Sequence, residues 1–308
     1  EGELRFKQAL FDPEGVIVYE RTGPVEPLKN EILSGPEGGS VVFPAWSPDG
    51  AIIAYRVTQP ARSGGIYVVP AGGGKPQRAV GESGTTDPLA WGPHSKRIAF
   101  ANASKGNMDI YIVDIFSGTV ERVTTDGGSD TSPSWASDGR EIVFCSDRGG
   151  TADIWVKDLE TGKLDRISSG GGNTYPAVSP GGRRIAWIRE GRGLVILDRD
   201  TGRQSVIETP REVSFVPAWS PDGRVLAVTA RDWGGADVYL TAADGSSALL
   251  LTKSDSGEGM PSWAPGGDRM AIVSNEEGDY RLRVLDGVAA FTERVLHPPE
   301  ILTFPPPE

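Results

Sequence analysis

The 308 residues, 38% hydrophobic and 24% charged, exclude a disordered chain and provide enough apolar material for a large core. The net charge of −11 repels phosphate groups, so we expect no nucleic-acid partner. No apolar run approaches the roughly 18 residues of a membrane-spanning helix, and we expect no transmembrane segment. The 41 glycines and 24 prolines are typical of short strands separated by turns.

One core motif, Pro-x-Trp-Ser-Pro-Asp-Gly, recurs with variations along the chain. The repeats start near Pro44, Pro88, Pro133, Pro176, Pro217 and Pro261, at intervals of 41 to 45 residues. Apolar runs such as Ile52–Tyr55 and Ile66–Val69 follow each core, and an Asp-x-x-Ser/Thr-Gly turn leads to a closing run such as Arg122–Thr124. Four short strands per repeat, without a long 3.6-residue period, predict the blades of an all-β propeller.

Five of the six cores carry a tryptophan. A blade cannot bury both of its faces alone, so blades stack around an axis. We expect these large aromatic side chains to fill the space between neighbouring blades. The tryptophans are Trp46, Trp91, Trp135, Trp219 and Trp263.

The two ends of the sequence resemble parts of one further repeat. Residues 301–308 are similar to a first strand, and residues 4–11, 16–23 and 30–35 are similar to the other three. We therefore predict one domain over residues 1–308, a seven-bladed propeller in which 301–308 plus 1–39 form a split blade. A six-bladed ring with residues 1–39 as an appendage is the alternative.

The repeated Pro-x-Trp-Ser-Pro-Asp-Gly core, followed by Ile-Ala-Phe and Ile-Tyr-x-x-Asp runs, resembles the TolB-type branch of WD-like propeller repeats. The resemblance covers nearly the whole chain. It implies a propeller fold and, from TolB itself, periplasmic binding of a lipoprotein. Similar repeats occur beside serine peptidases and in some polysaccharide lyases, and the fold does not choose among these roles.

Few residues suggest catalytic chemistry. His94 occupies the turn position held by Asp49 in the first repeat, and His297 lies near the tail. Two histidines so placed do not support a transition-metal centre. Cys145 follows an apolar run and is expected to be a buried, inert thiol. We expect no cofactor, although calcium could be held by oxygens in loops entering one face: Asp126, Asp130, Asn173 and Glu258.

The most promising ligand site is geometric. Innermost strands of a propeller line a central channel, so the residues just before each leading proline should converge at one channel mouth. These residues differ between repeats, which suits an extended peptide or a polar ligand. They are Phe43, Asp87, Ser132, Tyr175, Val216, Met260 and Phe304.

From these patterns we expect a monomeric, non-catalytic scaffold that binds a protein or peptide partner in the periplasm or elsewhere outside the cytoplasm. The chain begins at Glu1, which fits either a removed signal peptide or a trimmed sequence. One alternative is a carbohydrate-active lyase or hydrolase with its site at the channel mouth. Another is a sensory propeller partnered with a peptidase or transporter.

Overall fold

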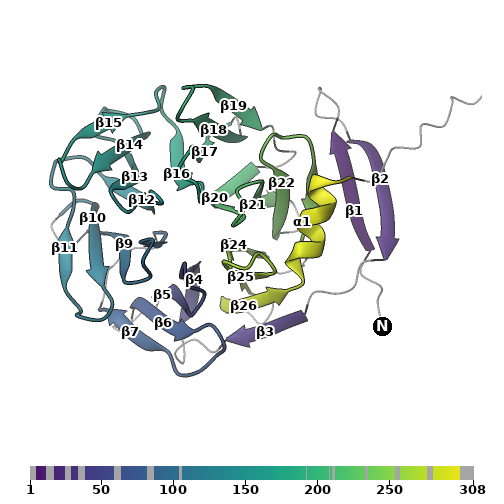
Figure 1. Ribbon diagram of the computed structural model, residues 1–308, viewed down its shortest axis with the longest axis horizontal. Coiled ribbons are helices and arrows are strands. Elements are labelled where there is room, and N and C mark those ends of the chain that lie inside the picture. The colour runs from purple at the N-terminus through teal and green to yellow at the C-terminus, as the bar shows by residue number, and fades with distance from the viewer. Residues whose placement is uncertain are drawn as a thin grey trace, which may run out of the picture.

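A computed structural model shows six β-sheets arranged around a central axis (Figure 1). The structure describes residues 5–11, 17–24 and 29–33 by their backbone. It further describes residues 39–58, 64–81, 87–103, 106–191, 193–207, 209, 212–232, 235–253, 257–275 and 280–298. Among these residues, no helix has the length and hydropathy needed to cross a membrane.

Each sheet contains one blade, and in blades 1 to 5 the four blade strands follow one another in chain order and pair antiparallel from the hub outwards. Blade 1 comprises β4 (Ser40–Trp46), β5 (Ile52–Thr58), β6 (Gly65–Pro70) and β7 (Gln77–Val80). Blade 2 comprises β8 (Ala90–Trp91), β9 (Arg97–Asn102), β10 (Asp109–Asp114) and β11 (Val120–Arg122). Blade 3 comprises β12 (Asp130–Trp135), β13 (Glu141–Ser146), β14 (Asp153–Asp158) and β15 (Leu164–Arg166).

The remaining blades follow the same plan. Blade 4 comprises β16 (Asn173–Val178), β17 (Arg184–Arg189), β18 (Gly193–Asp198) and β19 (Gln204–Ile207). Blade 5 comprises β20 (Glu212–Trp219), β21 (Val225–Asp232), β22 (Gly235–Ala242) and β23 (Ala248–Leu250). Blade 6 comprises β24 (Glu258–Trp263), β25 (Arg269–Ser274), β26 (Arg281–Asp286) and, from the other end of the chain, β3 (Lys29–Leu33).

The prediction of an all-β propeller is confirmed, but the prediction of seven blades is wrong because the N-terminal strands join blades that already exist. β3 pairs with β26 and supplies the outermost strand of blade 6. β1 (Arg5–Phe11) and β2 (Ile17–Pro24) form a hairpin added to the outer edge of blade 5 through β23. Residues 301–308, assigned by the sequence to the first strand of a seventh blade, lie outside the described residues.

In the sequence of the sixth repeat, a helix follows β26 where the other repeats have their fourth strand. α1 (Val288–Leu296) begins after Gly287, whose φ of 85° turns the chain away from β26. Its buried side chains Val288, Phe291 and Val295 are spaced along one helical face. They pack with strands of blades 5 and 6, so the outer position of blade 6 is left to β3 (Figure 1).

Six apolar clusters join the six blades in a ring, one cluster between each pair of neighbours. At five interfaces a core tryptophan packs in the same cluster as an alanine from the preceding blade, as Trp91 does with Ala54. Three tryptophans also donate their indole N–H to a carbonyl of that blade: Trp91 to Ala45 at 2.8 Å, Trp219 to Ala177 at 3.0 Å and Trp263 to Ala218 at 3.1 Å. The tryptophans are therefore structural links between blades, as the sequence predicts.

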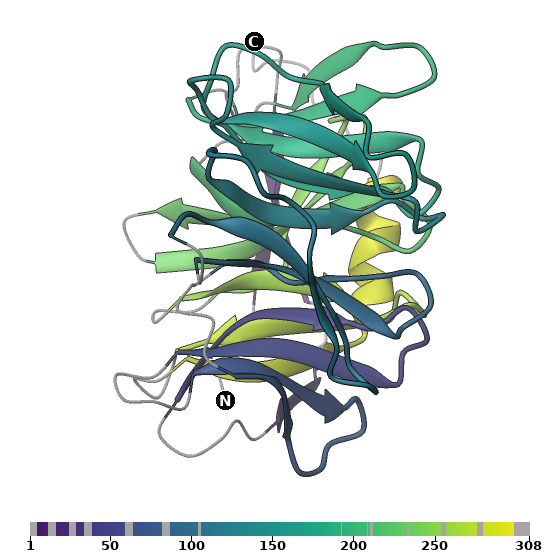
Figure 2. The same ribbon diagram turned by 90° about the vertical axis from the view of Figure 1, so that its left-hand side faces the viewer.

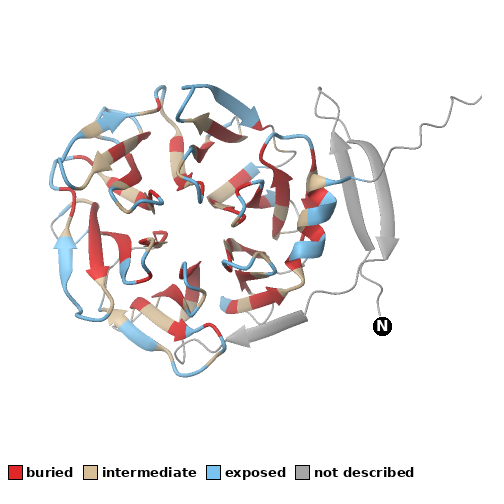
Figure 3. Cartoon of the chain, viewed as in Figure 1, coloured by how far each residue is buried: buried red, intermediate tan, exposed pale blue. Residues whose placement is uncertain are grey.

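At the interface between blades 3 and 4, two valines stand in place of the tryptophan and the alanine. Blade 4 carries Val178 at the tryptophan position, and blade 3 carries the larger Val143 where the other preceding blades carry alanine. Both valines belong to one cluster. The smaller side chain at position 178 is partly offset by the larger one at position 143, which keeps the interface closely packed. Figure 2 shows the blades as successive twisted layers, and Figure 3 shows that burial concentrates in their inner strands.

Candidate functional site

The innermost strands share a bulge that turns side chains into the hub. In β4, Val42 pairs with Arg56 and Ala45 pairs with Ala54, so two residues of β4 lie opposite one residue of β5. Five non-glycine residues at such bulges have φ between 51° and 64°, a conformation that side chains rarely adopt. The strain is held by contacts between blades, since the Met260 backbone N–H donates to Thr229 Oγ1 of the preceding blade at 2.9 Å. The five are Phe43, Ser132, Tyr175, Phe215 and Met260.

Three aromatic rings from blades 1, 4 and 5 meet across the hub. The ring centroids of Phe43 and Phe215 lie 5.8 Å apart, and those of Tyr175 and Phe215 lie 6.4 Å apart, both in edge-to-face geometry. The Met260 sulfur lies 3.3 Å from the Phe43 backbone nitrogen and accepts its hydrogen bond. This apolar cluster of Phe43, Tyr175, Phe215 and Met260, which we call the waist, lies across the hub.

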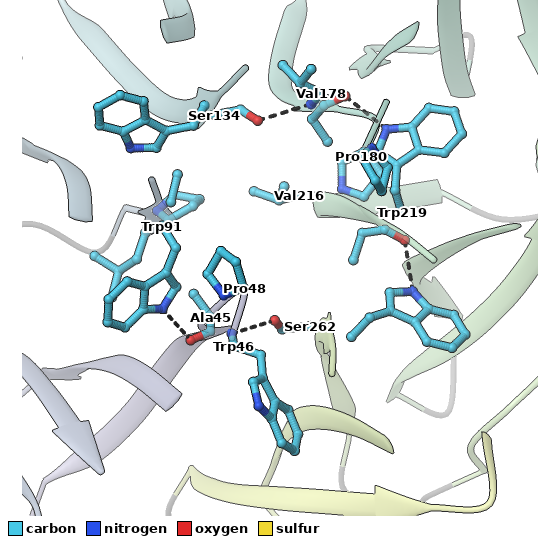
Figure 4. Close-up of a pocket in the computed structure, with 18 of the residues that line it drawn as sticks. Ala45, Trp46, Pro48, Trp91, Ser134, Val178, Pro180, Val216, Trp219 and Ser262 are labelled. Carbon is cyan, nitrogen blue, oxygen red and sulfur yellow. Dashed lines mark hydrogen bonds between the residues drawn. The ribbon is translucent and has the colours of Figure 1, made fainter. Parts of the chain in front are cut away.

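Beside this cluster the hub holds an open cavity of about 500 Å³, which we call the funnel, lined by residues from all six blades (Figure 4). Phe43, Phe215, Val216 and Met260 line it at the waist. Its wall contains the five core tryptophans and eleven prolines, including the buried leading prolines and the second prolines of the core motif. Among the described residues that line it, none has a titratable side chain.

The rim of the funnel is built from the tight turns that follow each core. The Asp49 carboxylate accepts hydrogen bonds from the Ser47 hydroxyl at 2.6 Å and the Ala51 backbone N–H at 3.0 Å. These bonds lower the pKa of Asp49, although burial opposes them slightly. His94 is exposed at the corresponding position of blade 2, as expected for a turn residue. The second prolines Pro48, Pro180 and Pro265 are exposed there, which leaves the funnel open to solvent.

Asp87 and Ser132 form a buried polar contact in the hub. The Ser132 backbone N–H and hydroxyl donate to the Asp87 carboxylate at 2.7 and 3.2 Å. Burial raises the pKa of Asp87 to about 6, although these bonds and the charge of Arg56 oppose the rise. Arg56 is itself only 1% exposed and donates to the Ala101 carbonyl at 3.0 Å, and burial lowers its pKa to about 10. This network ties together blades 1, 2 and 3.

The structure distributes the predicted channel residues over these features. Phe43, Tyr175 and Met260 lie around the waist, and Val216 lines the funnel. Asp87 and Ser132 bond to each other with 8% and 3% of their surface exposed. Phe304 lies outside the described residues.

Two parts of the site were missed by the sequence analysis. Blade 5 has one residue more than the others in its bulge, so Phe215 rather than Val216 takes the left-handed conformation. The insertion can be seen in the sequence only if the bulge is already known. The second missed part is the set of second prolines, which line the funnel. They are visible in the repeated core motif, and the turn that they occupy at the end of each innermost strand was the signal for their position.

The candidate calcium ligands have partners within the chain. Arg148 pairs with Asp126 at 2.8 Å and with Asp130 at 2.7 Å, and Arg283 lies 3.4 Å from Glu258. The Asn173 amide donates to Asp153 at 2.8 Å. In the described part of the chain, no group of three or more His, Cys, Asp or Glu residues has a metal-binding arrangement. Burial raises the pKa of the Cys145 thiol to about 12, which suits the inert role predicted for it.

The family described as the TolB beta propeller domain matches residues 36–196 and 174–295. A "Protein TolB homolog" of Chlorobium luteolum is 36% identical over 114 residues, covering 36% of this chain and 26% of the relative. The "Tol-Pal system protein TolB" of Desulfosudis oleivorans is 31% identical over 118 residues, again 36% of this chain and 26% of the relative.

The fold is also similar to that of TolB from Acinetobacter baumannii in its crystal structure, with a TM-score of 0.69 and 25% sequence identity. The match covers 85% of this chain and 67% of that one. The sequence similarity to the relatives from Chlorobium luteolum and Desulfosudis oleivorans spans about a quarter of their length.

Proposed function

Because the chain belongs to the TolB beta propeller family, we propose that it is a non-catalytic scaffold whose funnel binds an apolar segment of a protein partner. The observation that carries the proposal is the composition of the funnel wall, where prolines from all six blades, backed by five largely buried tryptophans, surround one open space. Prolines have fixed φ and lack a backbone N–H, so this wall is rigid and poor in hydrogen-bond donors. Such a surface favours apolar and aromatic side chains of an extended peptide.

The chemistry of the wall also argues against the carbohydrate-active alternative at this place. A glycosidase or lyase needs groups that donate and accept protons within reach of the sugar. The described residues that line the funnel offer serine hydroxyls, indole N–H groups, backbone groups and apolar side chains, and none of them titrates as an acid or base. A binding role requires none of the missing groups.

The names of the relatives suggest a setting for this activity. One of the curated relatives is a Tol-Pal system protein. We extend this to the chain as a proposal: its partner is an envelope protein, and binding takes place outside the cytoplasm. A monomer suffices for this role, because one ring supplies the whole funnel.

The proposal is tested by selecting short peptides from a displayed random library on the purified chain and measuring their affinity by fluorescence anisotropy. Val216 projects toward the middle of the funnel (Figure 4), so Val216→Trp fills space that a peptide side chain would enter. Val206 lies on the outer strand β19 with 50% exposure, and Val206→Trp is the matched control.

We expect selected peptides to be rich in apolar residues and to lose at least tenfold in affinity to Val216→Trp, with affinity for Val206→Trp unchanged. Peptides that bind both variants as tightly as the parent protein would place partner binding elsewhere. Turnover of oligosaccharides by the purified chain, abolished by Val216→Trp, would establish the enzymatic alternative instead.

A further inference from the structure

A second, polar cavity of about 350 Å³ lies between blades 3 and 4. Blade 3 contributes residues of β15 and the loop after it, including Arg166 and Ser169, and blade 4 contributes Trp187, Arg189 and Gln204. The loop after β15 leads into the innermost strand β16, at the end of the blade opposite the turns that form the funnel rim. The cavity is therefore separate from the funnel.

Most polar groups around this cavity belong to a scaffold that the repeats share. Arg166 pairs with Asp153 and donates from Nε to the Ser168 carbonyl at 3.0 Å. In blade 2, Arg122 likewise pairs with Asp109 at 2.6 Å and donates from Nε to the Thr124 carbonyl at 2.9 Å. The Arg166–Asp153 pair is thus a repeated structural contact with its charges balanced.

Arg189, however, is peculiar to blade 4. It lies four positions after Ile185 in β17, and the other second strands carry uncharged residues at that position: Val57, Asn102, Ser146, Ala230 and Ser274. Its guanidinium reaches the loop after β15, since Nη2 lies 3.1 Å from the point where a Cβ on Gly170 would stand. No described carboxylate forms an ion pair with Arg189, including the nearby Asp153, which is bound by Arg166.

The neighbouring interface also has an arginine against its loop, but from another position, because Arg148 lies two residues beyond Ser146, the residue that matches Arg189. Between blades 2 and 3, Arg148 lies against the corresponding loop and pairs with both Asp126 and Asp130. The two loops can be aligned by Thr124 and Ser168, whose hydroxyls accept the equivalent backbone N–H groups of Ile110 and Ile154.

In this alignment Gly170 corresponds to Asp126, because each lies two residues after the hydroxyl. Asn173 corresponds to Asp130, because each begins an innermost strand. Arg189 therefore lies against a loop that has neither of the carboxylates found beside Arg148, and a cavity lies next to it.

We propose that this cavity binds a small molecule whose carboxylate pairs with Arg189, as Asp126 and Asp130 pair with Arg148 in the neighbouring interface. The planar guanidinium can bind a carboxylate through two parallel hydrogen bonds. The side chains of Ser169 and Gln204 make no hydrogen bond to other described residues and can bond hydroxyl groups of the same ligand. The volume suits a ligand about the size of an acidic monosaccharide.

The test is an NMR titration of the full chain that follows the Arg189 Nε–H and Trp187 indole N–H signals. The probes are sodium acetate, sodium glucuronate and inorganic phosphate, each compared with sodium chloride at equal ionic strength. We expect saturable shifts with both carboxylates, with glucuronate binding more tightly than acetate because of its hydroxyls.

Two variants of the cavity and one control complete the experiment. Arg189→Gln removes the cation, and Ser169→Asp supplies a carboxylate from within the chain; we expect each to weaken glucuronate binding at least tenfold. Arg203→Gln removes an exposed arginine from the same blade and should leave the affinity unchanged within twofold. An unchanged melting temperature in Arg189→Gln shows that a loss of binding is local.

Three results would overturn the proposal. The first is a shift that chloride reproduces, and the second is undiminished affinity in Arg189→Gln. The third is saturation by phosphate without any response to either carboxylate.

Discussion

The paired exchange at Val143 and Val178 allows a direct test of how the blades are held together. At this interface alone, a valine stands where five other blades carry tryptophan, and a valine stands where the facing blades carry alanine. We predict that the double variant Val143→Ala, Val178→Trp rebuilds the common tryptophan–alanine contact.

The magnitudes follow from the buried volume. Val143 is fully buried, so Val143→Ala removes two methyl groups and should lower the free energy of unfolding by about 2 kcal/mol, including a small cavity. Val178→Trp alone forces an indole against Val143 and should cost about 1–3 kcal/mol. Independent effects would sum to about 3–5 kcal/mol, whereas we expect the double variant to lie within about 1 kcal/mol of the parent.

The assay is equilibrium unfolding in urea, followed by tryptophan fluorescence and far-ultraviolet circular dichroism for all four proteins. The reverse exchange, Ala99→Val with Trp135→Val, provides a second cycle at the interface between blades 2 and 3, where both residues share one cluster. Effects that add to within about 0.5 kcal/mol in both cycles would refute the reasoning, because residues in contact should couple more strongly.

Three further predictions concern buried groups. Because burial raises the pKa of Asp87 to about 6 from 3.8, the folded state binds this proton more tightly than the unfolded chain, so its contribution to stability falls as pH rises between about 4 and 6. Relative to Asp87→Asn, the parent should lose about 3 kcal/mol of unfolding free energy between pH 3.5 and 7, and parallel pH profiles for the two proteins would contradict this. Cys145, whose thiol pKa is raised to about 12 by burial, should resist iodoacetamide at pH 8 until the chain unfolds, and rapid labelling of folded protein would show that the thiol is accessible. Trp219→Ala should lower the free energy of unfolding by about 3–5 kcal/mol, because it removes a large side chain and its hydrogen bond to Ala177, and a loss below 1 kcal/mol would argue against its role between blades.

Local signals in the sequence predicted the strands well, because alternation and turn chemistry are encoded within a few residues. Even the N-terminal strands lie near their predicted positions, at Arg5–Phe11, Ile17–Pro24 and Lys29–Leu33. Their partners were predicted wrongly, since pairing is decided by which edges remain open elsewhere in the ring. Blade 6 has an open edge because α1 follows β26, and the spacing of Val288, Phe291 and Val295 was the signal for that helix.

The candidate site shows the same division between local and distant information. Repetition identified the prolines and tryptophans that build the funnel, because every blade supplies them in register. The meeting of Phe43 with Phe215 across the hub depends on an extra residue in the β20 bulge and on the diameter of a six-bladed ring. Neither quantity can be obtained from the spacing within one repeat.

Binding of a partner in the funnel would be seen in the contacts that a bound peptide makes. The measurement is a set of intermolecular nuclear Overhauser effects between a selected peptide and the methyl-labelled chain. We expect effects between peptide side chains and the Val216 and Met260 methyl groups, which line the funnel. Effects confined to methyl groups of the outer strands, such as those of Val120 or Val206, would contradict it.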